Sequence, residues 1–120
     1  MTKPIPFEAH VRRSEGFIAI DMVGELNAFA ENELQRAFTE AKELDPSAIV
    51  LNFSQVSYIN STGIALIVGL LAEARKTHSR LAVFGLSDHY VRIFQITRLA
   101  DFMSIYPDEE TALANAEVEK

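Results

Sequence analysis

Residues 48–76 have the sequence AIVLNFSQVSYINSTGIALIVGLLAEARK, and they decide the fold of this chain. Their first part, residues 48–53, is a short apolar run rich in branched side chains, which is typical of a strand covered on both faces. A brief connection follows, and from Ser61 to about Lys76 the residues are apolar nearly all round a helix. We therefore predict a central strand, a polar turn and a heavily buried helix.

A β-hairpin is predicted at the start of the chain. Apolar residues recur with a period of two in residues 7–11 and again in residues 17–23, as expected for strands with one buried face. Residues 14–16, Ser-Glu-Gly, separate the two runs and are typical of a tight turn. Gly24 breaks the alternation, so we expect the second strand to end there.

A helix is predicted after the hairpin, with Asn27 as the residue that can cap it. The helix should end before Asp45 and Pro46, because proline disfavours the helical conformation in the residue before it. Phe29 and Ala30, on the way into this helix, are predicted to be core residues. The apolar face of the helix consists of Leu34, Ala37, Phe38, Ala41 and Leu44.

Strands and helices continue to alternate in the second half of the chain. Residues 81–84 have the composition of a buried strand, residues 91–96 fall in a short helix, and residues 104–106 can form an edge strand. Asp108 can cap a last helix. The alternation predicts an α/β fold with a mixed sheet of about five strands, a hairpin plus parallel strands, covered by about four helices.

The length and composition favour a single domain. The chain has 120 residues, of which 48% are hydrophobic, and this is enough to fill one core of ordinary size. No repeat, linker or shift in composition divides it. We expect one domain over residues 1–120, with its core in about 7–115 and frayed ends at residues 1–6 and about 116–120.

Charge and cysteine content exclude several classes of protein. The chain has no cysteine, so it cannot form a disulfide, and its net charge of -6 disfavours contact with a phosphate backbone. The most apolar window, residues 64–72, is about half the length of roughly 20 residues that a membrane span needs. Residues 1–6 do not form a secretory signal. We expect a cytoplasmic protein with no membrane span and no direct nucleic-acid contact.

Catalytic and metal-binding patterns are not found in the sequence. His10, His78 and His89 fall in different predicted elements and do not have the spacing of metal ligands. A Gly-x-Ser-x-Gly elbow is missing, because the residue two positions before Ser61 is Ile59. No glycine-rich nucleotide loop occurs. We therefore expect no metal, no cofactor and no catalytic residue.

The turn Asn60-Ser61-Thr62-Gly63 has two interpretations. Asn60 or Ser61 can be the helix cap, accepting a hydrogen bond from a free N–H group of the first turn. Alternatively, the Ser61 hydroxyl is a phosphorylation site, since a phosphate there would meet unpaired N–H groups and the positive end of the helix dipole. Gly63 and Gly69 are expected to permit close packing. Gly63 can also leave the Ser61 hydroxyl open to a partner, in which case Gly63→Ala would impair binding without impairing folding.

Several segments resemble the STAS domain, and they are closest to its bacterial anti-sigma-factor antagonists. The first hydroxyl residue after the strand is phosphorylated in that family, within Asp-Ser-Ser-Gly or Asp-Ser-Thr-Gly. The matching residue here is Ser61, with Thr62 as the second choice. The resemblance covers about residues 7–113, and its segments are GELN (24–27), IVLNF (49–53), NSTG (60–63) and VRIFQITRL (91–99).

The resemblance implies a partner-switching cycle. The unphosphorylated domain would bind an anti-sigma-factor serine kinase, phosphorylation of Ser61 would release it, and a metal-dependent serine phosphatase would reset the switch. Asn60 and Asn27 stand where the family usually has Asp, which makes the docking face less acidic while keeping the capping ability. The implied partner-binding residues are Asn27, Asn60, Ser61, Thr62 and Gly63.

Two other functions fit the same sequence. The domain can be a scaffold or interaction module of a larger regulatory or transport complex, in which Ser61 is only a cap and is not phosphorylated. A pocket at the edge of the sheet can also bind a small molecule, which would raise the melting temperature. The sequence leaves the oligomeric state open, a weak homodimer included.

Overall fold

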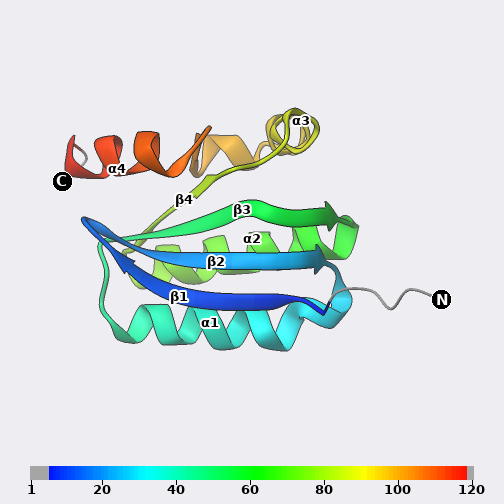
Figure 1. Cartoon of the computed structure of the whole chain (residues 1–120), viewed down its shortest axis with the longest axis horizontal. Helices are drawn as coiled ribbons and strands as arrows, with labels where there is room; N and C mark the ends of the chain where they lie inside the picture. Colours follow the sequence, from blue (N-terminus) through cyan, green and yellow to red (C-terminus); the bar gives the residue numbers. More distant parts are fainter. Residues whose placement is uncertain (1–5, 119–120) are drawn as a thin grey trace.

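The computed structural model describes residues 6–118, and the predicted strands and helices follow in the predicted order (Figure 1). Of the ends predicted to be frayed, residues 1–5, 119 and 120 lie outside this range, and residues 116–118 continue the last helix. The elements are β1 (Glu8–Ser14), β2 (Phe17–Leu26), the 3-10 turn η1 (Ala28–Ala30), α1 (Glu31–Glu43), β3 (Ala48–Ile59), α2 (Ser61–Lys76), β4 (Arg80–Phe84), α3 (Asp88–Ile96), the 3-10 turn η2 (Leu99–Asp101), β5 (Ser104–Tyr106) and α4 (Glu109–Val118).

The strands form one mixed sheet in the order β1-β2-β3-β4-β5. β1 pairs antiparallel with β2 as a hairpin, and β2, β3, β4 and β5 run parallel to one another. Parallel neighbours need a crossover connection, which α1, α2 and α3 provide in turn. The predicted α/β fold with a hairpin and parallel strands is therefore confirmed.

One face of the sheet carries the main hydrophobic core. Alternate residues of the strands, such as Ile20 in β2 and Leu51 in β3, point toward α1, α2 and α3. The largest fully buried side chains include Phe38 from α1, Ile67 from α2 and Phe94 from α3. The apolar face predicted for α1 is confirmed, since Leu34, Ala37, Phe38 and Ala41 are buried there.

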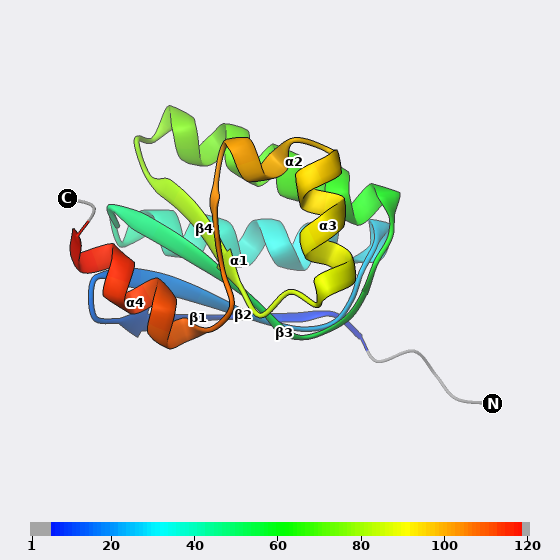
Figure 2. The ribbon, with the colours of Figure 1, turned by 90° about the horizontal axis from the view of Figure 1, so that it is seen from above.

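The opposite face of the sheet is covered by α4, which Figure 2 shows apart from α1 and α2. Its residue Ala112 packs on a second, smaller cluster from the other set of alternating strand residues. The cap predicted for this helix is confirmed: Asp108 Oδ1 accepts a hydrogen bond from the Thr111 N–H at 2.8 Å. The residues of the second cluster are Phe17, Ala19, Ala48, Val50, Ala82, Phe84 and Ala112.

Several predicted boundaries were wrong, and each error has a physical reason. β2 continues through Gly24 to Leu26, and β3 continues past residue 53 to Ile59, because the two strands pair along this length with irregular register shifts. The polar residues that suggested a connection, Ser54, Gln55 and Ser57, are exposed residues of β3. Asn27 caps the short turn η1 and not α1, which begins only at Glu31.

Helix α2 is less buried than its composition predicts. Gly63, Ile67, Leu70, Leu71 and Ala74 are its buried residues, and they form the stripe that faces the sheet. Its outer face is exposed although it is mostly small or apolar. The exposed residues there include Ala65, Val68, Gly69 and Ala72.

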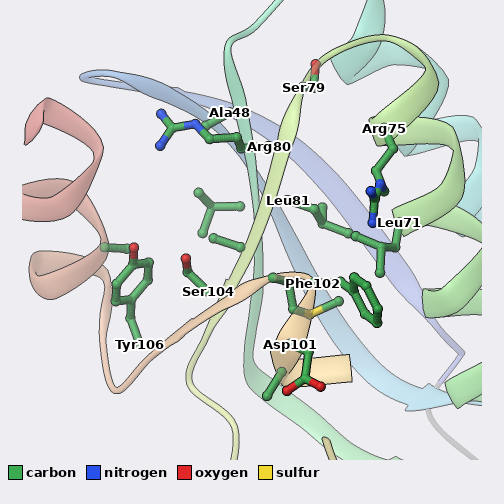
Figure 3. Close-up of a pocket in the computed structure, with 15 residues that line it drawn as sticks. Ala48, Leu71, Arg75, Ser79, Arg80, Leu81, Asp101, Phe102, Ser104 and Tyr106 are labelled. Carbon is green, nitrogen blue, oxygen red and sulfur yellow. The ribbon is translucent and has the colours of Figure 1, made fainter. Parts of the chain in front are cut away.

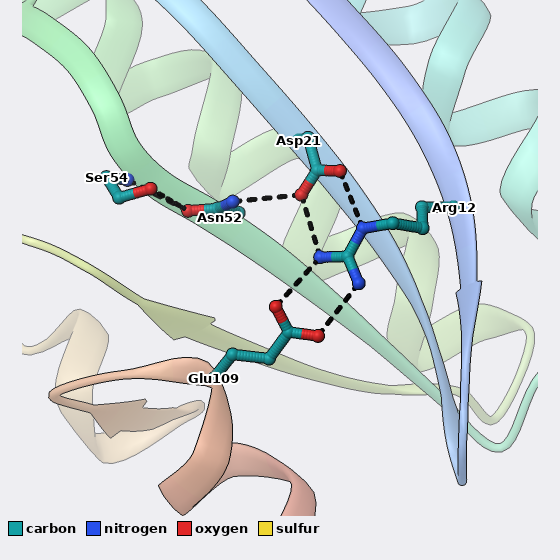
Figure 4. A network of polar contacts seen from close by, with 5 residues as sticks. All are labelled: Arg12, Asp21, Asn52, Ser54 and Glu109. Carbon is teal, nitrogen blue, oxygen red and sulfur yellow. Dashed lines mark hydrogen bonds and ion pairs between the residues drawn. The ribbon is translucent and has the colours of Figure 1, made fainter.

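A polar network holds α4 against the hairpin (Figure 4). The Arg12 guanidinium lies between two carboxylates, donating to Asp21 through Nε at 2.7 Å and to Glu109 through Nη1 at 2.8 Å. Asn52 Nδ2 also donates to Asp21, at 2.9 Å. The hydrogen bond from Arg12, and then that from Asn52, lowers the pKa of the Asp21 carboxyl below its usual range although partial burial opposes this.

The lowered pKa of Asp21 predicts acid sensitivity. A carboxyl with a depressed pKa in the folded state stabilises the fold above its unfolded pKa of about 3.9, and this stabilisation is lost as the pH falls through the folded value. We expect the free energy of unfolding to decline below about pH 4, with a smaller decline in Asp21→Asn. Urea unfolding at a series of pH values measures this decline. An equal decline in the free energy of unfolding for both proteins would contradict the prediction.

Candidate functional site

The predicted site residues meet at the carboxyl edge of β2 and β3. Leu26 and Ile59 are partners in the parallel register, so the residues that follow them, Asn27 and Asn60, lie at the ends of neighbouring strands. The Asn60 N–H donates to the Leu26 carbonyl oxygen at 3.2 Å, which ties the start of α2 to the end of β2. The turn η1 also contacts α2. The structure therefore brings together Asn27, Asn60, Ser61, Thr62 and Gly63.

Asn60, and not Ser61, is the cap of α2. Its backbone is extended, with φ -96° and ψ -177°, and its Oδ1 accepts a hydrogen bond from the Gly63 N–H at 2.9 Å. Its carbonyl oxygen accepts from the Ile64 N–H at 3.0 Å. The interpretation of Ser61 as a cap is therefore wrong, because the neighbouring amide already fills that role.

Ser61 is the first residue of α2, and it is exposed. Within residues 6–118 its hydroxyl makes no hydrogen bond, and the N–H groups of Ser61 and Thr62 donate to no acceptor. These two N–H groups belong to the first turn, where a helix has no internal acceptors and where its dipole is positive. An anion attached at Ser61 would therefore find donors without any change in the fold.

The capping assignment predicts different effects on stability for two adjacent alanine substitutions. Asn60→Ala should lower the free energy of unfolding by about 1 kcal/mol, because the Gly63 N–H loses its acceptor. Ser61→Ala should change it by less than about 0.5 kcal/mol, because an exposed hydroxyl without a partner is removed. Chemical denaturation of both variants measures this difference. A larger loss in Ser61→Ala than in Asn60→Ala would refute the assignment.

Phe29 is the main residue of this region that sequence reasoning placed wrongly. It was predicted to lie in the core, but it is 95% exposed. The Asn27 side chain accepts from the Phe29 N–H at 3.0 Å and holds this residue in η1. The buried stripe of the first helical segment instead begins at Ala30 and continues with Leu34. The helical spacing of this stripe could have indicated that Phe29 is exposed, because Phe29 does not fall on the same face as Ala30 and Leu34.

At Gly63 the start of α2 packs closely against the end of β2. A Cβ atom there would lie 2.1 Å from the Leu26 carbonyl oxygen, far inside van der Waals contact. The close packing predicted for Gly63 is confirmed. The same contact indicates that Gly63→Ala would disturb the fold, so this variant cannot test partner binding separately from folding. Within residues 6–118, a Cβ at Gly69 would have no atom of another element within 4 Å, so the close packing predicted for Gly69 is not found there.

Tyr90 supports the same edge from α3, and the sequence analysis did not single it out. Its hydroxyl oxygen accepts a hydrogen bond from the Ile59 N–H at 2.9 Å, next to the Asn60 cap. Tyr58, the residue before Ile59, is 51% exposed.

Among the described residues, no three histidine or carboxylate side chains are grouped so that they could hold a metal ion. The site therefore consists of an exposed hydroxyl, free N–H groups and exposed aromatic surface.

This fold and this turn define a STAS domain. A profile of the STAS domain family matches residues 8–112, which is most of the chain. The chain belongs to this family, and the resemblance found in the sequence is confirmed.

No helix within residues 6–118 is both long and apolar enough to cross a membrane.

Within the family, the chain is similar to anti-sigma-B factor antagonists. It is 32% identical to that of Listeria monocytogenes over 93 residues, covering 78% of this chain and 82% of the relative. It is 34% identical to that of Staphylococcus aureus over 89 residues, covering 74% of this chain and 82% of the relative.

Solved structures share the fold at lower identity. An anti-sigma factor antagonist from Mycobacterium paratuberculosis has a TM-score of 0.83 and 20% identity, with 98% of this chain and 99% of that chain covered. The unphosphorylated form of the anti-sigma factor antagonist SpoIIAA has a TM-score of 0.69 and 18% identity, with 95% of this chain and 99% of that chain covered. These likenesses support the assignment of the fold alone.

Proposed function

We propose that this chain is an anti-sigma-factor antagonist that acts by partner switching. The unphosphorylated protein binds an anti-sigma serine kinase, phosphorylation of Ser61 releases it, and a metal-dependent serine phosphatase restores the binding form. The cycle takes place in the cytoplasm, and the chain contributes a docking surface and no catalysis. The observation that carries the proposal is the exposed Ser61 hydroxyl, which is free of capping because Asn60 fills that role.

The local geometry supports a switch that acts on the surface and leaves the fold intact. A phosphate on Ser61 adds about -1.5 to -2 charges at neutral pH, beside the free N–H groups of Ser61 and Thr62 and the positive end of the α2 dipole. The helix can accept this charge without unfolding. A partner that packs on the neutral hydroxyl would have to desolvate the new charge, which weakens the complex.

Phe29 is the proposed apolar anchor of the docking surface. Its ring is almost fully exposed beside a site whose other members are small and polar, and exposed aromatic residues often dominate binding energy. Phe29→Ala should weaken the complex with the kinase by about 2 kcal/mol, or roughly 30-fold, without lowering the melting temperature. Isothermal titration calorimetry measures the affinity. Tyr58 is also an exposed aromatic residue, so Tyr58→Ala shows whether a loss of affinity for the kinase is particular to Phe29.

The modification itself is tested by mass spectrometry. The full chain is incubated with ATP and a serine kinase of the anti-sigma type from its own organism, and the modified peptide is mapped. We expect one phosphate on Ser61, absent in Ser61→Ala and retained in Thr62→Ala. Failure of every such kinase to modify the chain, combined with a stable complex that Ser61→Asp does not weaken, would favour the scaffold role.

A further inference from the structure

A cavity lies at the sheet edge formed by β4 and β5 (Figure 3). β5 is only three residues long and pairs with Ala82, Val83 and Phe84, so Arg80 and Leu81 at the start of β4 are not paired with it. The chain before β5 turns away through η2 and does not continue along β4. This departure leaves a hollow with a volume of about 720 Å³. Ligand sites commonly have volumes of about 300–1,000 Å³.

The cavity has apolar walls and small lining residues. Leu71 of α2, Leu81 of β4 and Met103 before β5 are core residues that reach it from one side of the sheet edge. Val50 and Ala82 line it from the other side. The space is left open because many of its lining side chains are short. Six of the fifteen lining residues are alanine or serine: Ala48, Ser79, Ala82, Ala100, Ser104 and Ala112.

The mouth of the cavity combines a cation with an aromatic ring. The Arg75 guanidinium carbon lies 5.5 Å from the centre of the Phe102 ring, and Phe102 is 57% exposed. Arg75 makes no ion pair within residues 6–118. The one acidic lining residue, Asp101, is paired with Arg98 at 2.6 Å. Arg75 therefore gives the mouth a positive charge that no described carboxylate pairs with, and this favours an anion.

We propose that this cavity binds a small organic acid with an apolar body. The body packs against Leu71, Leu81 and Met103, where burial of apolar surface favours binding. The acidic group meets the planar guanidinium of Arg75, which can donate two parallel hydrogen bonds to a carboxylate or sulfonate. The site lies at the far end of α2 from Ser61, about 20 Å away along the helix axis, so it does not rest on the proposed phosphorylation.

A fluorescence titration of the full chain with anilinonaphthalene sulfonate tests the proposal, since this probe joins two aromatic systems to one anionic group. We expect saturable binding that raises the melting temperature, which distinguishes a folded site from binding to unfolded chain. Arg75→Gln should weaken binding by at least about tenfold, because the charged hydrogen bonds are lost. Arg92→Gln, which removes an exposed arginine of α3 outside the cavity, should leave it unchanged.

Competition defines the class of ligand. Decanoate should displace the probe, whereas nonyltrimethylammonium, with the same nine-carbon chain and the opposite charge, should not. Phe102→Ala should also weaken binding while the protein stays folded, since the ring is largely exposed. The absence of saturable binding, equal affinities in Arg75→Gln and Arg92→Gln, or equal displacement by both competitors would each overturn the proposal.

Discussion

Gly63→Ala is expected to lower the free energy of unfolding by about 3 kcal/mol and the melting temperature by about 10 °C. The added Cβ would lie 2.1 Å from the Leu26 carbonyl oxygen and 2.9 Å from its carbon. These are backbone atoms, and the same oxygen accepts the Asn60 N–H. Relief of the overlap would therefore move the end of β2 or the start of α2, and the Asn60 cap with it.

Gly69→Ala is the matched control for this substitution. It makes the same chemical change in the same helix, but the new Cβ would have no atom of another element within 4 Å among the residues that the structure describes. Alanine has the higher helix propensity at an exposed interior position, so this variant should be more stable than the original protein by about 1 kcal/mol. Thermal and chemical denaturation of the two variants should therefore give shifts of opposite sign. Shifts of the same sign would contradict the packing described for α2.

Ser61→Asp should weaken the proposed complex with the kinase by about 3 kcal/mol, or more than a hundredfold. The substitution places one negative charge where the partner would contact a neutral hydroxyl, and an unpaired charge in an interface loses its hydration. The fold should become slightly more stable, by about 0.5 kcal/mol, because an acidic side chain suits the N-terminus of a helix. Calorimetric titration and denaturation of the same sample measure the two effects.

Ser61→Asn separates charge from size, since asparagine has the shape of aspartate without its charge. We expect Ser61→Asn to retain most of the affinity that Ser61→Asp loses. If both variants lose affinity equally, the effect comes from the size of the side chain and not from its charge. If neither loses affinity, Ser61 lies outside the docking surface.

The strands and helices are predicted well from the sequence because hydrophobic periodicity indicates which side chains of an element are buried. The face of α1 from Leu34 to Ala41 and the hairpin before it follow directly from helical and alternating spacing. The turn at Asn60 was also predictable, since Asn followed by two hydroxyl residues between a strand and a helix is a capping sequence. The sequence did not show whether Asn60 or Ser61 caps the helix, because both side chains can accept a hydrogen bond from an N–H group of the first turn.

Tertiary contacts account for the features that the sequence did not predict. The polar end of β3 is a strand only because β2 lies beside it, and the partner strand is not visible in local composition. The exposure of Phe29 depends on the short turn η1, which sets it outside the buried stripe of α1. The cavity beside β4 exists because β5 is short, and this length is set by where the chain leaves η2.

The most direct measurement compares the phosphorylated and unphosphorylated protein in titration against the same anti-sigma serine kinase. The phosphorylated sample is first shown by mass spectrometry to carry one phosphate on Ser61. The proposed switch predicts that its affinity is at least about a hundredfold lower while its melting temperature is unchanged or higher. Equal affinities of the two forms would contradict the claim that Ser61 is the switch.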